Sequence, residues 1–256
     1  ANISRLMQIC NEVDRPDLLF PKYRGSVPKE FEKQPHRPHA MFEVIAEGDR
    51  LIHHPYQSFQ PVIDFLTAAA IDPDVVAIKQ TIYRTGEDSE LMRLLLAAAK
   101  AGKEVTVVVE LMARFDEQTN INWASRLEEV GAHVVYGVVG HKTHAKMLLV
   151  LRRENGRIRR YAHLGTGNYH PRTASLYTDF GLFTANSELC EDMDKVFAQL
   201  TGLGARRTLK LLLQSPFNMY STVMSMIQAE IKAAKAGKKA RIMAKMNSLI
   251  ESEVVE

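Results

Sequence analysis

Strand-like and helix-like segments alternate along the middle of this 256-residue chain. Apolar patterning predicts helices at 60–70, 89–101 and 119–130, placed between strands at 41–46, 75–83, 105–111 and 133–136. Strands joined by helices of this length form right-handed crossovers and run parallel in one sheet. The fold class that we predict is therefore α/β, with a mixed, mainly parallel sheet flanked by helices.

Two arginines follow strands of this predicted sheet. Arg84 comes directly after the strand at 75–83, and Arg114 follows the strand at 105–111. Ligands of such sheets gather at the carboxyl ends of the strands, where both arginines emerge. A surface charge at a loop start is the alternative for each residue, but their shared placement favours ligand binding.

A hairpin follows the crossovers. An Asn-Gly turn at 155–156 separates two strand-like runs, 145–151 and 157–164. A further strand is predicted at 177–183, and a helix begins at Ser187. The two-residue turn requires its flanking strands to pair antiparallel, which defines a register for the whole hairpin.

That register brings a histidine, a lysine and an amide to one end of the hairpin. Lys146 is expected opposite Gly165, and His144 opposite Gly167 with Asn168 one step away. Strand alternation puts His144 and Lys146 on one face, and we expect the glycines to leave room for a bulky ligand. These groups suit a phosphoryl-transfer site. The alternative is a polar strand end beside a glycine turn.

Composition limits the kind of protein. Hydrophobic residues make up 46% of the chain, as in ordinary globular proteins, and two cysteines without metal-ligand spacing argue against a disulfide scaffold or a zinc site. No apolar run reaches the roughly 18 residues of a spanning helix, and the N-terminus lacks a signal-peptide pattern. We therefore expect a cytoplasmic protein without a membrane span.

Basic residues are concentrated in one segment. Residues 141–172 carry eight Lys or Arg residues and one acid, Glu154, whereas the whole chain has a net charge of only +3. Such a segment attracts a polyanion, whether nucleic acid, phospholipid headgroup or inorganic phosphate chain. A solvated hairpin tip explains the arginines at 152, 153, 157 and 159 at least as well, so the residues near His144 carry more weight.

The two ends of the chain differ from the middle. Residues 1–39 contain five prolines and are predicted to be a leader or linker from a preceding domain. The pattern at 54–59 returns at 215–220, and each copy leads through a helix into an apolar strand, the second at 242–245. The predicted domains are thus 1–39, a first lobe at 40–212, and the truncated start of a second, similar lobe at 213–256.

His144, Lys146 and the Gly165–Asn168 segment resemble the phospholipase D signature, in which two paired lobes each contribute a histidine. The match is not complete. The aspartate that the superfamily carries five residues beyond the lysine is Leu151 here, and the gap to the glycine motif is longer. This departure argues against simple phosphodiester hydrolysis.

A closer resemblance, covering nearly the whole chain, is to the bacterial ATP-dependent polyphosphate kinases of the long-chain type, whose catalytic lobes share the phospholipase D fold. It rests on the segments 78–85, 107–117, 141–146, 164–169 and 177–179. The resemblance implies an ATP:polyphosphate phosphotransferase with a phosphohistidine at His144 and reversible transfer of the terminal phosphoryl group of ATP to polyphosphate. It also implies that Tyr177 contacts ATP, and that Arg84 and Arg114 belong to the magnesium and phosphate region.

The resemblance further implies the ligands and partners. Mg²⁺ is the expected cofactor, and because an arginine cannot ligate a cation, Arg84 and Arg114 would act on it only through shared phosphates. ATP or ADP and inorganic polyphosphate are the expected substrates, with no nucleic acid and at most peripheral membrane association. The full-length protein is expected to be a homo-oligomer with a second catalytic lobe, and the isolated fragment to be inactive.

The residues themselves are consistent with these roles. A histidine is largely neutral at physiological pH, and nearby cations disfavour its protonated form further, so His144 can attack a phosphoryl group that Lys146 and the arginines stabilise. His141 competes with His144 on composition alone, but only His144 has a lysine two residues on. Asp179 either orients His144 or bonds a neighbouring main chain. Roles in structure or general phosphate contact are expected for His163 and His170, and core packing for Trp123.

Two other functions fit the sequence. A phospholipase D-type nuclease or lipase would cleave phosphodiesters without ATP or metal. A non-catalytic polyanion-binding lobe would bind polyphosphate without being labelled.

Overall fold

In a computed structural model of the chain, residues 6–21, 23–32, 38–83, 88–110, 117–138, 140–202 and 208–255 are described. Its strands are β1 (Arg50–His53), β2 (Val75–Ile82), β3 (Glu104–Val109), β4 (His133–Tyr136), β5 (Lys146–Glu154), β6 (Arg157–Gly165) and β7 (Phe180–Thr184). Its helices are α1 (Leu6–Glu12), the 3-10 turn η2 (Pro16–Leu18), α2 (Lys29–Glu32), α3 (Pro38–Ala46), α4 (Gln60–Ile71), α5 (Glu90–Lys100), α6 (Glu117–Glu129), α7 (Pro171–Ala174), α8 (Ser187–Leu200), α9 (Met219–Lys235) and α10 (Ser252–Val255).

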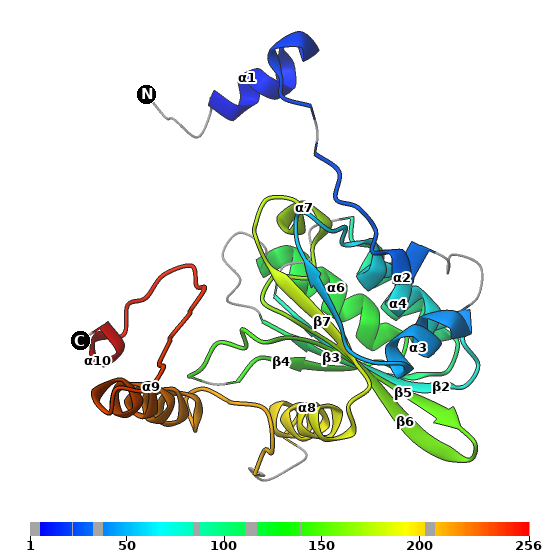
Figure 1. The fold of residues 1–256 in the computed structure, drawn as a ribbon. Helices are drawn as coiled ribbons and strands as arrows, with labels where there is room; N and C mark the ends of the chain where they lie inside the picture. The colour runs from blue at the N-terminus through cyan, green and yellow to red at the C-terminus, as the bar shows by residue number, and fades with distance from the viewer. Residues whose placement is uncertain are drawn as a thin grey trace. The chain divides into compact units, whose positions relative to one another are not determined.

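The strands form one mixed sheet in the order β1-β7-β6-β5-β2-β3-β4 (Figure 1). The mixed α/β class is confirmed, but parallel pairing is confined to β2, β3 and β4. All other neighbours pair antiparallel, which makes the parallel part smaller than predicted. The reason is the hairpin: strands joined by a two-residue turn must run antiparallel, and β7 and β1 continue that alternation beyond it.

The hairpin forms in the predicted register. Lys146 pairs with Gly165 and Glu154 with Arg157. Asn155 and Gly156 both have positive φ, 49° and 74°, as a turn that follows the right-handed twist of its strands requires. The ladder starts at Lys146, so the predicted pairing of His144 with Gly167 lies beyond it.

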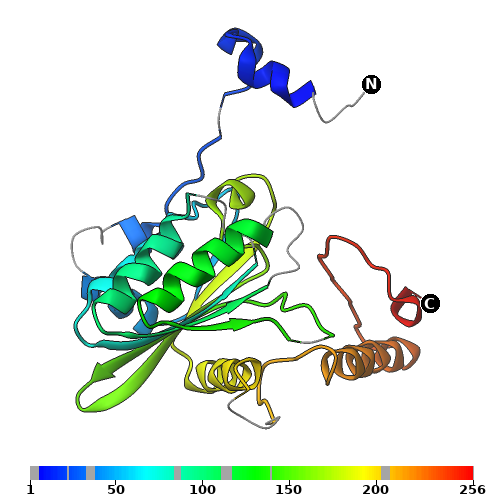
Figure 2. The same cartoon turned by 180° about the vertical axis from the view of Figure 1, so that it is seen from behind.

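Helices cover both faces of the sheet (Figures 1 and 2). The face that packs on α3, α4, α5 and α6 holds the main core, and α8 packs on β5 and β6 from the other side. Aromatic rings join the elements of the main core: Phe42 of α3 lies 4.9 Å from Tyr161 of β6, and Phe65 of α4 lies 5.7 Å from Phe183 of β7, measured between ring centroids. This apolar layer holds the hairpin strands against the helices.

The strand predicted at 41–46 is wrong, because these residues belong to the helix α3. A short apolar run has no periodicity that separates a strand from a buried helix. Met41, Phe42 and Ile45 are buried in the helical form, against α4 and the sheet. The edge position of the sheet goes instead to β1, which the sequence did not reveal.

The chain divides into two compact units, residues 1–205 and 206–256. In the second unit, α9 confirms the predicted helix after the Ser-Pro motif. The apolar strand predicted at 242–245 is wrong: these residues are irregular, with Ile242 and Met243 exposed. A strand requires a neighbour for its backbone hydrogen bonds, and residues 242–245 join no ladder in the part of the chain that the structure describes. The similarity of this segment to a second lobe stays a prediction.

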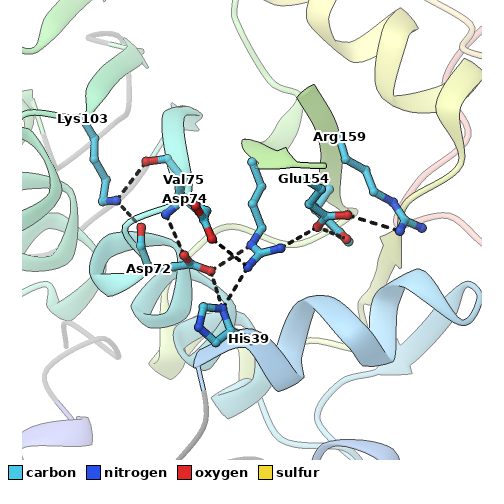
Figure 3. Close-up of polar contacts among 9 residues, drawn as sticks. His39, Asp72, Asp74, Val75, Lys103, Glu154 and Arg159 are labelled. Atoms are coloured by element: carbon cyan, nitrogen blue, oxygen red, sulfur yellow. Dashed lines mark hydrogen bonds and ion pairs between the residues drawn. The ribbon is translucent and has the colours of Figure 1, made fainter. Parts of the chain in front are cut away.

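A network of ion pairs stabilises the tip of the hairpin, beside the Asn155–Gly156 turn (Figure 3). The guanidinium of Arg152 donates to Asp72 at 2.9 Å, to Glu154 at 2.8 Å and to Asp74 at 3.5 Å. His39, at the start of α3, lies 3.0 Å from the Asp72 carboxylate. Residues from α3, the α4–β2 connection and β5 are thereby joined at one point.

Asp72 is the central acid of this network, because its side chain is fully buried. Burial by itself raises the pKa of this carboxyl, but hydrogen bonds from Arg152 and from the Asp74 main chain, together with the charges of Arg152 and His39, lower the pKa below its ordinary value. The ionised carboxyl of Asp72 therefore stabilises the fold at pH values above its pKa in the unfolded chain. This contribution to stability is lost as the pH falls through the lower pKa of the folded state.

We predict that Asp72→Ala lowers the free energy of unfolding by about 3 kcal/mol at neutral pH, because it removes a fully buried carboxylate and leaves the largely covered guanidinium of Arg152 and the imidazole of His39 without this partner. Urea unfolding followed by circular dichroism measures this change. The control is Asp74→Ala, which removes a half-exposed carboxylate and should cost less than about 1 kcal/mol. Equal losses in the two variants would contradict the central role of Asp72.

Candidate functional site

Several of the described residues that the sequence singles out lie at one end of the strands, where β2 and β3 finish and β5 begins. β2 ends at Ile82 and β3 at Val109, and the antiparallel strand β5 begins beside them at Lys146. Gly165, at the end of β6, pairs with both Lys146 and Gly181 of β7. His144, the Gly165–Asn168 segment, Tyr83 after β2 and Glu110 after β3 therefore lie at the same end of these strands.

His144 and Lys146 both contact the ring of Tyr83. The imidazole of His144 meets this ring edge-on, with 5.2 Å between centroids, and its side chain is exposed. The ammonium of Lys146 lies 5.1 Å from the centre of the same ring and donates to the main-chain oxygen of His144 at 2.5 Å. Because Lys146 is only 5% exposed, a buried cation and an accessible imidazole share contact with one aromatic ring.

The pKa of His144 lies below its ordinary value. Partial burial is the main cause, followed by the positive charges of Lys146 and Lys142. Both effects disfavour the imidazolium form. At neutral pH the ring is therefore uncharged and has a nitrogen lone pair available for attack.

Thr81 binds the main chain immediately after His144. Its hydroxyl donates to the main-chain oxygen of Ala145 at 2.7 Å and accepts from the main-chain N–H of Met147 at 2.9 Å. Immediately before His144, the carboxylate of Glu110 accepts from the main-chain N–H of Thr143 at 2.7 Å. Sequence reasoning missed Tyr83, Thr81 and Glu110, although each lies at the carboxyl end of a strand, the same signal that pointed to Arg84 and Arg114.

Asp179 closes the glycine-rich loop. Its carboxylate accepts from the hydroxyl of Thr166 at 2.8 Å, and the same hydroxyl accepts from the main-chain N–H of Phe180 at 2.9 Å. A Cβ added to Gly167 would overlap this carboxylate. The bond that the structure shows, from the Thr166 side chain, is neither of the two roles expected for Asp179, which were to orient His144 or to bond a neighbouring main chain.

The glycines do not leave the predicted room for a ligand. Asp179 occupies the space beside Gly167, and a Cβ on Gly181 would overlap the ring of His163. The glycines are needed because other side chains of the protein pack on their backbone.

His163 packs inside the protein. Burial lowers its pKa to about 3, with a smaller effect from His54, and one ring nitrogen lies 2.9 Å from the hydroxyl of Tyr169. Its ring contacts Phe183. These contacts favour the structural role for His163. The His170 ring accepts from the main-chain N–H of Thr173 at 3.4 Å and so caps α7, which favours a structural role for His170 as well.

The remaining candidates stand at different places. Asn168 is half-buried beside the loop, and its side-chain oxygen has no hydrogen-bond partner among the residues that the structure describes. Tyr177 is 56% exposed between α7 and β7. Arg84 and Arg114 lie outside the described residues, so their roles stay predictions. His141 is exposed at a bridge to Val138, and Trp123 is buried on α6, as predicted.

The basic segment separates into two parts. At the hairpin tip a cavity of about 630 Å³ is lined by the Arg152 network, whose carboxylates neutralise much of the positive charge. Nine-residue β5 separates this tip from Lys146 by roughly 30 Å. Arg160 is bound by Asp194 of α8. The His144 end therefore remains the better candidate for an anionic substrate.

Two family models match the chain. The model described as polyphosphate kinase C-terminal domain 1 matches residues 40–206, and polyphosphate kinase C-terminal domain 2 matches residues 212–256. The chain belongs to the polyphosphate kinase family. Both family matches fall beside the predicted lobe boundary, which itself stays a prediction.

Relatives agree with this family. The polyphosphate kinase of Burkholderia ambifaria is 62% identical over 259 residues, covering 100% of this chain and 37% of that protein. The crystal structure of polyphosphate kinase from Porphyromonas gingivalis has a TM-score of 0.82 at 36% identity, covering 94% of this chain and 39% of that chain. The phospholipase D family member Nuc from Salmonella typhimurium is also similar, at 17% identity, with a TM-score of 0.48 over 63% of this chain and 99% of that one. The chain thus spans little more than a third of the polyphosphate kinases it matches.

We predict that Gly167→Ala destabilises the protein by about 2 kcal/mol, because the new methyl group displaces the Asp179 carboxylate. Urea unfolding measures the loss. In an Asp179→Gly background the same substitution should cost much less, since the Asp179 Cβ at 2.9 Å is removed together with the overlapping carboxylate. An undiminished cost in that background would contradict the overlap.

We predict that Lys142→Met raises the pKa of His144 towards the ordinary histidine value, because it removes one of the two positive charges that lower it. NMR titration of the His144 ring proton, assigned with His144→Ala, measures the shift. Lys100→Met, at the far end of the crossover helix α5, is the control and should leave the titration unchanged. A lower pKa in Lys142→Met would be the wrong sign.

Proposed function

We propose that this chain carries the nucleophile of a polyphosphate kinase and that His144 is its phosphorylated residue. One observation carries the proposal: an accessible imidazole with a lowered pKa lies beside the start of β5, and a buried ammonium bonds to its main chain and contacts the same Tyr83 ring. In phosphoryl transfer the protein contributes mainly positioning and fixed positive charge, and this arrangement supplies both.

The reaction that we propose has two steps. A ring nitrogen of His144 bonds to the terminal phosphorus of ATP, the bond from that phosphorus to the bridging oxygen breaks, and ADP leaves with the electron pair. A terminal oxygen of polyphosphate then attacks the same phosphorus, and the imidazole leaves uncharged once more. Each step is reversible because both directions share the phosphohistidine.

Further residues are assigned by the same proposal. Lys146, Arg84 and Arg114 stabilise charge on the transferred phosphoryl group, Asn168 donates an amide hydrogen bond, and Tyr177 contacts the nucleotide. Among the described residues, no three His, Cys, Asp or Glu side chains gather as a metal site would require. We propose Mg²⁺ as a partner of the nucleotide phosphates, which Arg84 and Arg114 would contact.

Other expectations remain. No helix in the described part of the chain is long and apolar enough to cross a membrane. Cytoplasmic location, homo-oligomeric assembly and the lack of nucleic-acid binding stay predictions.

We predict that γ-labelled ATP gives an acid-labile, alkali-stable label on a full-length protein that contains this chain, and that His144→Ala abolishes it. Protein-bound label is measured after alkaline and acid treatment. His141→Ala is the matched control, since it removes a nearby histidine and should retain the label. A label that survives in His144→Ala would contradict the assignment.

The same samples separate the other functions. Cleavage of a phosphodiester without ATP would support a phospholipase D-type activity. Salt-sensitive polyphosphate binding without any label would support a non-catalytic lobe, and this is the result expected for the 256-residue chain alone.

A further inference from the structure

The segment that carries His144 lies outside the backbone ladders of the sheet. Residues 142–145 have no regular secondary structure, and the β5 ladder begins only at Lys146. A nucleophile must nevertheless be held close to its productive position, since a misplacement of about 1 Å can cost about 100-fold in rate. Side chains that bind this segment therefore matter for the position of the imidazole.

Glu110 binds the segment immediately before His144. It follows β3, is 3% exposed, and accepts from the main-chain N–H of Thr143 through one carboxylate oxygen at 2.7 Å. An N–H bond to an ionised carboxylate is among the stronger hydrogen bonds in proteins, and burial makes an unsatisfied N–H costly. The bond is thus suited to holding Thr143 in one place.

Glu110 is itself held on both sides. Its main-chain N–H donates to the oxygen of Ile82 at 2.8 Å. The amide of Asn120, fully buried on α6, donates to the main-chain oxygens of both Glu110 and Tyr83 at 3.1 Å. The ends of β2 and β3 are therefore joined, and the carboxylate extends from a fixed base to the His144 segment.

We propose that Glu110 is a positioning residue for His144, acting through the Thr143 main chain to hold the imidazole in line with the phosphoryl group. This inference rests on the proposed function of His144. The role that we propose is geometric and not electrostatic. Burial and the nearby lysines lower the pKa of His144, whereas a carboxylate that acted on the imidazole through its charge would raise that pKa. The carboxylate is buried and binds the main chain, so the role that we propose for it is indirect.

Glu110→Ala and Glu110→Gln test the inference, because only glutamine retains a side-chain oxygen that can accept from Thr143. In a full-length protein that contains this chain, Glu110→Ala should lower the rate of His144 labelling by about 100-fold with little change in the ATP concentration for half-maximal rate. Glu110→Gln should stay within a few-fold of the wild type. Glu104→Ala, at the exposed start of the same strand, is the matched control and should label normally.

Two further measurements separate positioning from a general structural effect. Diethyl pyrocarbonate needs no oriented complex, so its reaction with His144 should be unchanged in Glu110→Ala, as should the NMR-measured pKa of His144. Hydrogen exchange at the Thr143 amide should become faster in Glu110→Ala and stay slow in Glu110→Gln. This measurement uses the 256-residue chain and needs no activity.

Each outcome decides between the proposals. Normal labelling in Glu110→Ala, or an equally large loss in Glu110→Gln, overturns the positioning role. Unchanged Thr143 exchange in Glu110→Ala overturns it as well, even where the alanine variant labels poorly. Absence of label in the wild-type protein refutes instead the proposed function of His144, while the exchange data still show whether Glu110 holds the segment.

Discussion

The antiparallel pairing of β5 with β2 is the constraint on which the rest of the structure depends. It joins the hairpin to the parallel crossover strands, so the start of β5 comes to lie beside the ends of β2 and β3. Had β5 paired parallel to β2, His144 would emerge at the opposite edge of the sheet. The pairing therefore places the imidazole against Tyr83, and it gives the main chain at Thr143 and Ala145 its hydrogen bonds with Glu110 and Thr81.

The two ends of the hairpin use basic residues differently. At the tip, Arg152 of β5 is surrounded by carboxylates and joins α3 and the α4–β2 connection to the hairpin, which is a structural use of charge (Figure 3). At the other end, the ammonium of Lys146 lies against the Tyr83 ring and the His144 main chain. A count of basic residues in the sequence combines these two ends, although the His39 imidazole at the tip is bound to the Asp72 carboxylate, whereas the His144 imidazole contacts the Tyr83 ring.

Prediction from sequence succeeded where the signal is local. The Asn-Gly turn determined the register of Lys146 with Gly165, because both turn residues must adopt positive φ. It failed where the outcome depends on what a segment packs against: residues 41–46 became a helix because their apolar side chains face α4 and the sheet, and 242–245 have no strand to pair with in the described part. The packing of Asp179 against Gly167 and of His163 against Gly181 was not predicted either, because each pair is brought together by the fold and not by neighbouring positions in the chain.

The sequence by itself determined the α/β class, the hairpin register and the His-x-Lys pair beside a glycine-rich loop, because each follows from periodicity, turn chemistry or spacing along the chain. Only the tertiary structure decided which groups surround His144. Tyr83, Glu110 and Thr81 reach it from β2 and β3 by sheet pairing, and burial together with the neighbouring lysines sets the direction of its pKa. These are contacts between residues far apart in the chain, so no local pattern specifies them.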